Sequence, residues 1–252
     1  RQMKKVILAA VALAAFSTAA NAQETLRIGT EGAYAPWNFV NDAGELAGFE
    51  IDLGNAICEN TGMTCEFVQS EWDPIIPNLV AGNYDVIMAG MSITDERLET
   101  INFTQDYFPP DPSNYIAATG AGIDIESPSG LRIGVQGNTI QAGYAEENFA
   151  ADNTIVSFAT FDQSIADLAA GNVDVVLADG SSLDPVVANS GGALEMFGPD
   201  VMIGGGVGGG GRKEDTDLLA TLDEALTALK ADGTVDALIA EWFDGAGPFY
   251  TE

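Results

Sequence analysis

An internal repeat constrains the fold of this chain more than any other feature of its sequence. Residues 72–92 (WDPIIPNLVAGNYDVIMAGMS) and residues 161–181 (FDQSIADLAAGNVDVVLADGS) match at a constant offset of 89 positions. The four letters LRIG at 26–29 also recur, at 131–134. A duplicated unit predicts two halves of similar architecture.

Each half alternates between short apolar runs and amphipathic segments. Runs of strand length rich in Val and Ile predict strands buried on both faces, and strand–helix alternation predicts parallel sheets covered by helices. The sequence therefore predicts an α/β fold with two parallel-sheet lobes. Expected strands lie at 26–29, 64–68, 85–89, 131–134, 154–158 and 173–178, and expected helices at 49–61, 75–81, 139–149, 163–170, 184–189, 218–229 and 235–243, with a further helix starting at Thr94.

The first 22 residues have the pattern of a secretory signal peptide. Lys4 and Lys5 precede an apolar run at 6–16, and Ala-Asn-Ala at 20–22 is a small-x-small cleavage site. The run is too short for a membrane anchor, which needs about 20 apolar residues. Export to an oxidising compartment predicts a disulfide between Cys58 and Cys65. The alternative for this pair, a metal site, lacks other soft ligands nearby.

The charge balance excludes several classes of partner. Removing Arg1, Lys4 and Lys5 from nine basic residues leaves six against 38 acidic ones, a net charge of −32. Such a surface repels nucleic acid and anionic lipid, and it attracts cationic solutes or serves solubility in brine. The chain has no histidine, so the usual hydrolase triads are also excluded.

A glycine-rich stretch occupies residues 201–212 (VMIGGGVGGGGR). We expect a flexible crossing segment here rather than a strand, because glycine gives a strand no side chain to pack. A phosphate loop is disfavoured because no GK[ST] sequence follows.

Eight motifs occur in an order that resembles one family. They are the signal peptide, GTEGAYAPWNF, GFEIDLGNAIC, EWDPIIPNL, YDVIMAGMSITDER, GVQGNT, VDVVLADGS and RKEDTDL. The chain resembles the periplasmic solute-binding proteins of polar amino acid ABC importers, especially the lysine/arginine/ornithine-, histidine- and octopine/nopaline-binding members. The resemblance implies a two-lobed type II periplasmic binding protein with two hinge strands, near 109–112 and within 204–208. It places 23–108 and 208–252 in lobe 1 and 109–207 in lobe 2.

The resemblance also implies which residues hold the α-groups of the ligand. Arg97, in SITDER, would clamp the α-carboxylate, as suits a planar guanidinium. The amide of Thr139, at a helix start, would be the second carboxylate donor. Asp179 and the carbonyl of Gly90 would bind the α-ammonium, and Ser92 would contact both groups. From the residues alone, Arg97 could instead form a surface ion pair, and Asp179 or Ser92 could serve a local turn.

Four further residues would surround the ligand side chain. Tyr34 and Trp72 resemble the aromatic pair that encloses it, although each alone is more often a core residue. Glu31 would meet a distal cation, the alternative being a solvated surface acid. Gln141 would line the far end of the side chain.

These features predict a non-catalytic, monomeric receptor in the periplasm, without metal or cofactor. It would capture a free L-amino acid, basic or opine-like, and deliver it to a membrane permease. The alternatives are a binder of neutral or other polar amino acids, and a secreted dehydratase on the same fold.

Overall fold

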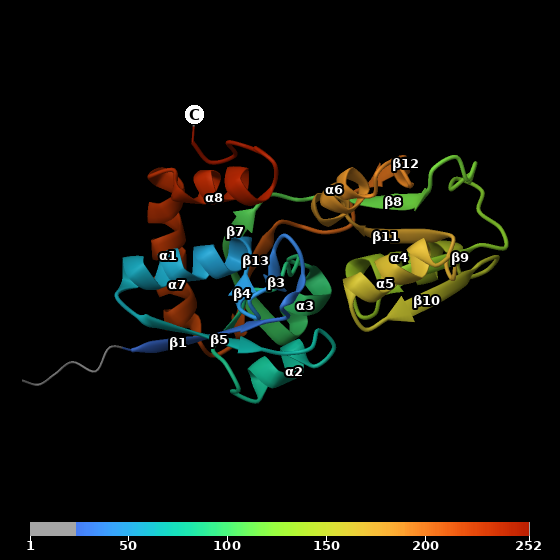
Figure 1. The fold of residues 1–252 in the computed structure, drawn as a ribbon. Helices are drawn as coiled ribbons and strands as arrows, with labels where there is room; N and C mark the ends of the chain where they lie inside the picture. Colours follow the sequence, from blue (N-terminus) through green and yellow to red (C-terminus); the bar gives the residue numbers. More distant parts are fainter. Residues whose placement is uncertain (1–23, 252) are drawn as a thin grey trace, which may run out of the picture.

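The computed structural model describes residues 24–251, which form two α/β lobes side by side (Figure 1). The proposed signal peptide, residues 1–22, lies outside the described residues. Within the described part of the chain, no helix combines the length and apolar character needed to cross a membrane.

The sheet of the first lobe has the strand order β5-β1-β6-β13-β7. Strand β1 pairs in parallel with both β5 and β6, as the alternation of strands and helices predicted. The late strand β13 then returns antiparallel between β6 and β7, which makes the sheet mixed. These strands span Thr25–Thr30 (β1), Thr64–Gln69 (β5), Val86–Ile87 (β6), Ile101–Phe108 (β7) and Val207–Arg212 (β13).

The sheet of the second lobe repeats this plan with the order β10-β9-β11-β8-β12. Strand β9 pairs in parallel with β10 and β11, while β8 is antiparallel to β11 and β12. The strands span Ser113–Ala118 (β8), Arg132–Gln136 (β9), Thr154–Phe158 (β10), Val175–Asp179 (β11) and Leu194–Val201 (β12).

Helices cover both sheets and begin and end close to the expected positions. In the first lobe they are α1 (Phe49–Thr61), α2 (Ile75–Val80), α3 (Asp95–Thr100), α7 (Thr216–Ala231) and α8 (Thr234–Trp242). In the second lobe they are α4 (Ile140–Phe149), α5 (Phe161–Ala169) and α6 (Gly180–Asn189). The first lobe also contains a small sheet that packs against α1, formed by β2 (Ala33–Tyr34), β3 (Asn38–Val40) and β4 (Leu46–Ala47).

The repeat appears in the structure as a matched pair of ion pairs. In the first lobe Arg27 binds Asp85 through its backbone amide, Nε and Nη2, the last at 2.6 Å from Oδ1. In the second lobe Arg132 makes the same three contacts with Asp174, again with Nη2 at 2.6 Å from Oδ1. Each pair joins the start of one strand to the start of its parallel neighbour, so both halves set their strand register in the same way.

The expectation of a flexible crossing segment at the glycine run is wrong for its second half. Residues 207–212 form β13, a buried strand between β6 and β7. The glycines permit close packing: a Cβ added at Gly211 would lie 2.8 Å from the Leu219 side chain of α7, and one at Gly208 would lie 3.2 Å from a backbone oxygen of β7. Glycine is accepted in this strand because its neighbours approach too closely for a side chain.

Two crossings connect the lobes (Figure 1). One runs from the end of β7 at Phe108 to the start of β8 at Ser113, and the other from the end of β12 at Val201 to the start of β13 at Val207. Ser92 forms an antiparallel bridge with Val207 beside the second crossing. This places the residues after β6 at the junction of the two lobes.

The predicted disulfide is confirmed: Cys58 in α1 bonds to Cys65 in β5. The link joins the helix to the edge strand of the first sheet. In the chain-entropy account, a loop this short stabilises the fold by about 2–3 kcal/mol.

Candidate functional site

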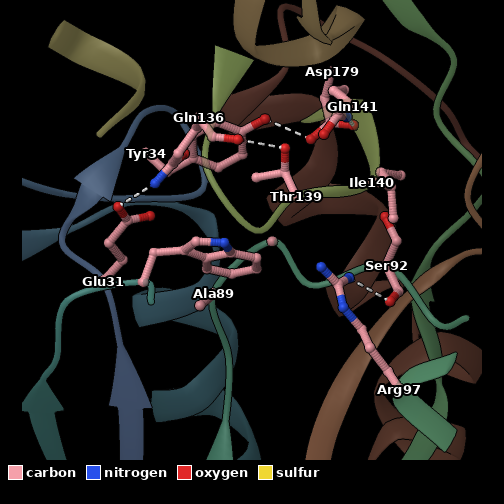
Figure 2. Close-up of a pocket in the computed structure, with 12 residues that line it drawn as sticks. Glu31, Tyr34, Ala89, Ser92, Arg97, Gln136, Thr139, Ile140, Gln141 and Asp179 are labelled. Carbon is pink, nitrogen blue, oxygen red and sulfur yellow. Dashed lines mark hydrogen bonds between the residues drawn. The ribbon is translucent and has the colours of Figure 1, made fainter. Parts of the chain in front are cut away.

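A cavity of about 320 Å³ lies between the lobes and contains every predicted ligand-binding residue. Figure 2 shows the labelled side chains converging from both sides. The lining residues are Glu31, Tyr34, Trp72, Ala89, Gly90, Ser92, Arg97, Gln136, Thr139, Ile140, Gln141 and Asp179. The structure thus brings together residues up to 148 positions apart in sequence. Ala89, Gln136 and Ile140 are the lining residues that the sequence analysis missed.

Arg97 supplies the positive charge of the cavity. It lies in the first turn of α3, where Thr94 caps the helix by accepting from the Arg97 amide at 3.2 Å. Its Nη1 donates to the Ser92 carbonyl at 2.8 Å, and its Cζ lies 5.4 Å from the centre of the Trp72 ring. Within residues 24–251 it forms no ion pair within 4.0 Å. Burial lowers the pKa of Arg97 to about 10, against the opposing effect of Asp179.

Asp179 is the negative charge at the same end of the cavity. It ends β11 and accepts hydrogen bonds from the Tyr34 hydroxyl at 2.5 Å and from the Gln141 amide at 2.7 Å. Burial raises the pKa of Asp179 to about 7, although these two donors lower it. Gln141 also donates to Ser113 at 2.9 Å. Gln141 therefore lies beside Asp179, and our expectation that it lines the far end of the side chain is wrong.

Glu31 is the second buried carboxylate, and Figure 2 shows it on the opposite side of the cavity from Arg97. It follows β1, is only 4% exposed, and accepts from Gln136 Nε2 at 2.7 Å. Burial raises the pKa of Glu31 to about 7; Gln136 lowers it, while Asp162 and Asp73 raise it further. The alternative of a solvated surface acid is therefore wrong for Glu31.

The start of α4 lines the cavity through Thr139 and Ile140. Thr139 is the N-cap: its hydroxyl accepts from the Ala142 amide at 3.1 Å and donates to the Gln136 carbonyl at 2.7 Å. The side chain is thus engaged locally. The first helical amide belongs to Ile140, and such amides have no partner within their own helix. Ile140 also lines the cavity, so the anion-binding helix end that we expected at Thr139 includes its neighbour.

A buried network fixes the backbone at Gly90. Glu50, in the first turn of α1, is fully buried and accepts from the Gly90 amide at 2.8 and 2.9 Å with its two oxygens. Asn38 and Tyr107 donate to the same carboxylate at 2.8 and 2.5 Å. Gly90 adopts φ +61°, and a Cβ there would lie 3.1 Å from the Tyr34 ring. This conformation and close contact favour glycine, and Glu50 orients its peptide.

Aromatic side chains join the lobes around the cavity. Tyr34 packs edge-on against Phe161 of the second lobe, with ring centres 5.3 Å apart. Trp72 Nε1 donates to the carbonyl of Asn138 at 3.3 Å, and the Asn138 side chain donates to Asp73 at 2.8 Å. With Tyr34–Asp179 and Gln136–Glu31, these contacts cross directly between lobes, so this is a closed conformation.

The ionisable groups of the cavity have a simple charge balance. Two carboxylates, Glu31 and Asp179, face one guanidinium, Arg97, and all three have pKa values displaced by burial toward the neutral form. Among residues 24–251, no group of three or more His, Cys, Asp or Glu side chains is placed to hold a metal ion. The cavity suits a solute that carries both signs of charge with one extra positive charge.

A two-lobed α/β protein with a cavity lined by charged and polar side chains between its lobes has the architecture of a solute receptor, and comparisons with known proteins agree. Residues 26–245 match the model of the bacterial extracellular solute-binding proteins, family 3, and the chain belongs to that family. Its fold is the type II periplasmic binding protein fold.

Named relatives extend this comparison. The lysine/arginine/ornithine-binding periplasmic protein of Escherichia coli K12 is 36% identical over 260 residues, covering 96% of this chain and 98% of that protein. A periplasmic His/Glu/Gln/Arg/opine family-binding protein from Silicibacter pomeroyi, solved in complex with lysine, is 52% identical with a TM-score of 0.82, covering 88% of this chain and all of that one. The ancestral amino acid-binding protein AncCDT-1, a precursor of cyclohexadienyl dehydratase, is 29% identical with a TM-score of 0.77, covering 87% and 95% of the two chains.

Proposed function

We propose that this protein is the periplasmic receptor of an ABC importer, which binds a free cationic L-amino acid between its lobes and presents it to a membrane permease. The observation that carries the proposal is the charge balance of the cavity. A zwitterionic head group with a cationic side chain has a net charge of +1. That charge neutralises two buried carboxylates and one guanidinium, each of which is otherwise poorly compensated.

Each charged group has a partner in this arrangement. Arg97 and the amide at the start of α4 bind the α-carboxylate, since a guanidinium and a helix N-terminus both favour anions. Asp179 and the Gly90 carbonyl bind the α-ammonium, and Ser92 lies between the two α-groups. Tyr34 and Trp72 flank the side chain, and Glu31 receives its distal cation. Arginine, lysine, ornithine and histidine fit this pattern, as do arginine-derived opines.

We also propose that residues 23–108 and 208–252 form one lobe and residues 109–207 the other. The last strand before the first crossing, β7, ends at Phe108, and the first sheet resumes with β13 at Val207, within one residue of the proposed boundary. Arg97 and Glu31 then lie in the first lobe, while Asp179 and Thr139 lie in the second. A ligand that bridges them favours the closed form by population shift.

Calorimetry with Arg97→Ala tests the proposal. The wild-type protein should bind at least one of arginine, lysine, ornithine, histidine or octopine. The variant should lose roughly 100-fold or more in affinity, because removing one partner of a buried charge pair leaves the other unpaired. Arg132→Ala removes an exposed arginine of the second lobe and serves as the matched control. Unchanged affinity in Arg97→Ala would exclude this carboxylate clamp.

A second candidate, a secreted dehydratase, is favoured by one observation. Two buried carboxyl groups with pKa values near 7 have the range that suits general acid–base catalysis. Turnover of prephenate or arogenate by the purified protein would support an enzyme. Tight binding of a basic amino acid without turnover of either compound supports the receptor.

A further inference from the structure

A second and larger cavity adjoins the first one on the Glu31 side. It is a groove of about 940 Å³, open to solvent, between the two lobes. Glu31 and Trp72 line both cavities, so these two side chains form the partition between them. Across the groove, the second lobe contributes Ala159 among its lining residues. In the closed protein, the end of the first cavity that lies away from Arg97 therefore adjoins this open groove.

The groove is acidic and lacks a protein counter-ion. Its lining includes Glu31, Glu71 and Asp73 but no lysine or arginine. Within the described part of the chain, none of these three acids forms an ion pair within 4.0 Å. Asp73 accepts only a neutral donor, the amide of Asn138 at 2.8 Å. Several carboxylates that line one groove produce a negative potential, which attracts cations.

We propose that this groove is a second subsite, which accepts a positively charged arm attached to the distal nitrogen of a basic amino acid. The inference rests on the proposed function, because it assigns the head group of the ligand to Arg97 and Asp179. The distal nitrogen then meets Glu31 at the partition, and the arm continues past it toward Glu71 and Asp73. The ligand class is N-alkylated basic amino acids with a second cationic group.

Three ligands of graded length and charge test the subsite by calorimetry. L-Lysine fills the first cavity only. Nε-Butyl-L-lysine adds an uncharged arm, and Nε-(4-aminobutyl)-L-lysine adds an arm of the same length that ends in an ammonium. All three keep a cationic distal nitrogen for Glu31. We expect all three to bind, with the aminobutyl compound about two- to fivefold tighter than the butyl compound, the range of a solvent-exposed ion pair.

Two variants locate the arm. Glu71→Gln changes an exposed acid that lines only the groove, and it should reduce the preference for the aminobutyl over the butyl compound while leaving lysine affinity unchanged. Ala159→Trp fills the groove from the second lobe at an exposed position, and it should weaken both extended ligands but not lysine.

Each contrary outcome is decisive. Lysine binding without binding of either extended compound would show that the partition is closed, and would overturn the subsite while leaving the proposed function intact. Equal affinity for the butyl and aminobutyl compounds would overturn its cationic character. Extended ligands that are insensitive to Ala159→Trp would place the arm elsewhere. Failure of both extended compounds and of all five ligands named above (arginine, lysine, ornithine, histidine and octopine) would overturn the proposed function, and the subsite with it.

Discussion

Replacing Glu31 with glutamine should stabilise the ligand-free protein while weakening its hold on cationic ligands. Glu31 is 4% exposed, its carboxylate accepts a hydrogen bond from Gln136 at 2.7 Å, and it forms no ion pair among residues 24–251. Glutamine has the same shape, and its amide oxygen can accept the same hydrogen bond. The substitution therefore removes the buried charge and little else.

The size of the stability effect follows from the pKa of this carboxyl group. Burial raises its pKa from 4.5 to about 7 in the folded protein. A difference of about 2.5 pH units corresponds to about 3 kcal/mol. Because the folded-state pKa is raised, ionisation of Glu31 destabilises the fold. The cost is absent below about pH 4.5, grows between 4.5 and 7, and is complete above 7. Glu31→Gln should match the wild type near the acid limit and exceed it by up to about 3 kcal/mol at about pH 8.

Ionisation of Glu31 destabilises the ligand-free protein as pH rises, but it should strengthen the binding of a cationic ligand. A cationic side chain beside Glu31 favours its ionised form, so binding should release protons near neutral pH and weaken as pH falls below about 7. Glu31→Gln should lose affinity for arginine and lysine more than for a neutral ligand such as glutamine. It should also show a shallower pH dependence.

Urea unfolding of ligand-free protein at the two pH values, with calorimetry across the same range, measures both effects. The ligand-free state is obtained by unfolding, dialysis and refolding. Glu71→Gln is the control, since it removes an exposed acid from the same side of the cavity and should change stability by less than about 0.5 kcal/mol. Equal stability of wild type and Glu31→Gln at the higher pH would refute the buried-charge argument. Equal losses of charged and neutral ligands would refute the role of Glu31 in specificity.

Three further predictions concern one hydrogen bond between the lobes and the stability of the first lobe. Tyr34→Phe removes the 2.5 Å hydrogen bond to Asp179, and calorimetry should show roughly tenfold weaker binding or more, because hydrogen bonds to charged groups contribute about 1.5–3 kcal/mol. Replacing Cys58 and Cys65 by serine should lower the free energy of unfolding by about 2–3 kcal/mol relative to the oxidised wild type, measured by urea unfolding, and the reduced wild type should resemble the variant. Gly211→Ala places a Cβ 2.8 Å from Leu219 and should cost about 1–3 kcal/mol in the same assay, whereas Gly44→Ala meets no atom within 4 Å and tests the cost of its positive φ alone.

The repeat contains more information about the site than the sequence analysis used. Gly90 and Asp179 occupy equivalent positions at the offset of 89, and both line the cavity. The LRIG repeat has an offset of 105, which pairs Glu31 with Gln136. Glu31 directly follows β1, and Gln136 is the last residue of β9, the equivalent strand of the second lobe. Gln136 donates a hydrogen bond to Glu31 across the lobes at 2.7 Å. The repeat could therefore have identified Gln136 as a site residue, because ligands bind at the carboxyl ends of the strands in α/β sheets.

The errors of the sequence analysis share a physical cause. Composition disfavours a strand at residues 207–212, but tertiary packing against Leu219 and the β7 backbone requires residues without side chains there. Gln141 was expected at the far end of the ligand side chain. One turn of helix instead directs it to Ser113 and Asp179. Local sequence predicted the elements well because amphipathic periodicity is local, whereas contacts between lobes depend on how two independent units meet.

The scarcity of basic residues makes the assignment of Arg97 stronger than a motif match. Among residues 24–251 there are six lysines and arginines, and Arg27, Arg132, Arg212 and Lys230 each form an ion pair. Arg97 is half-buried against Trp72 without one, in a chain with 38 acidic and nine basic residues. A surface role would give this guanidinium an abundant choice of carboxylates. Its isolation is explained if the partner is the carboxylate of a ligand, and the same ligand must then bring a positive charge to each of the two uncompensated acids. Those acids lie in different lobes, so a single cationic amino acid can stabilise the closed form only by touching both.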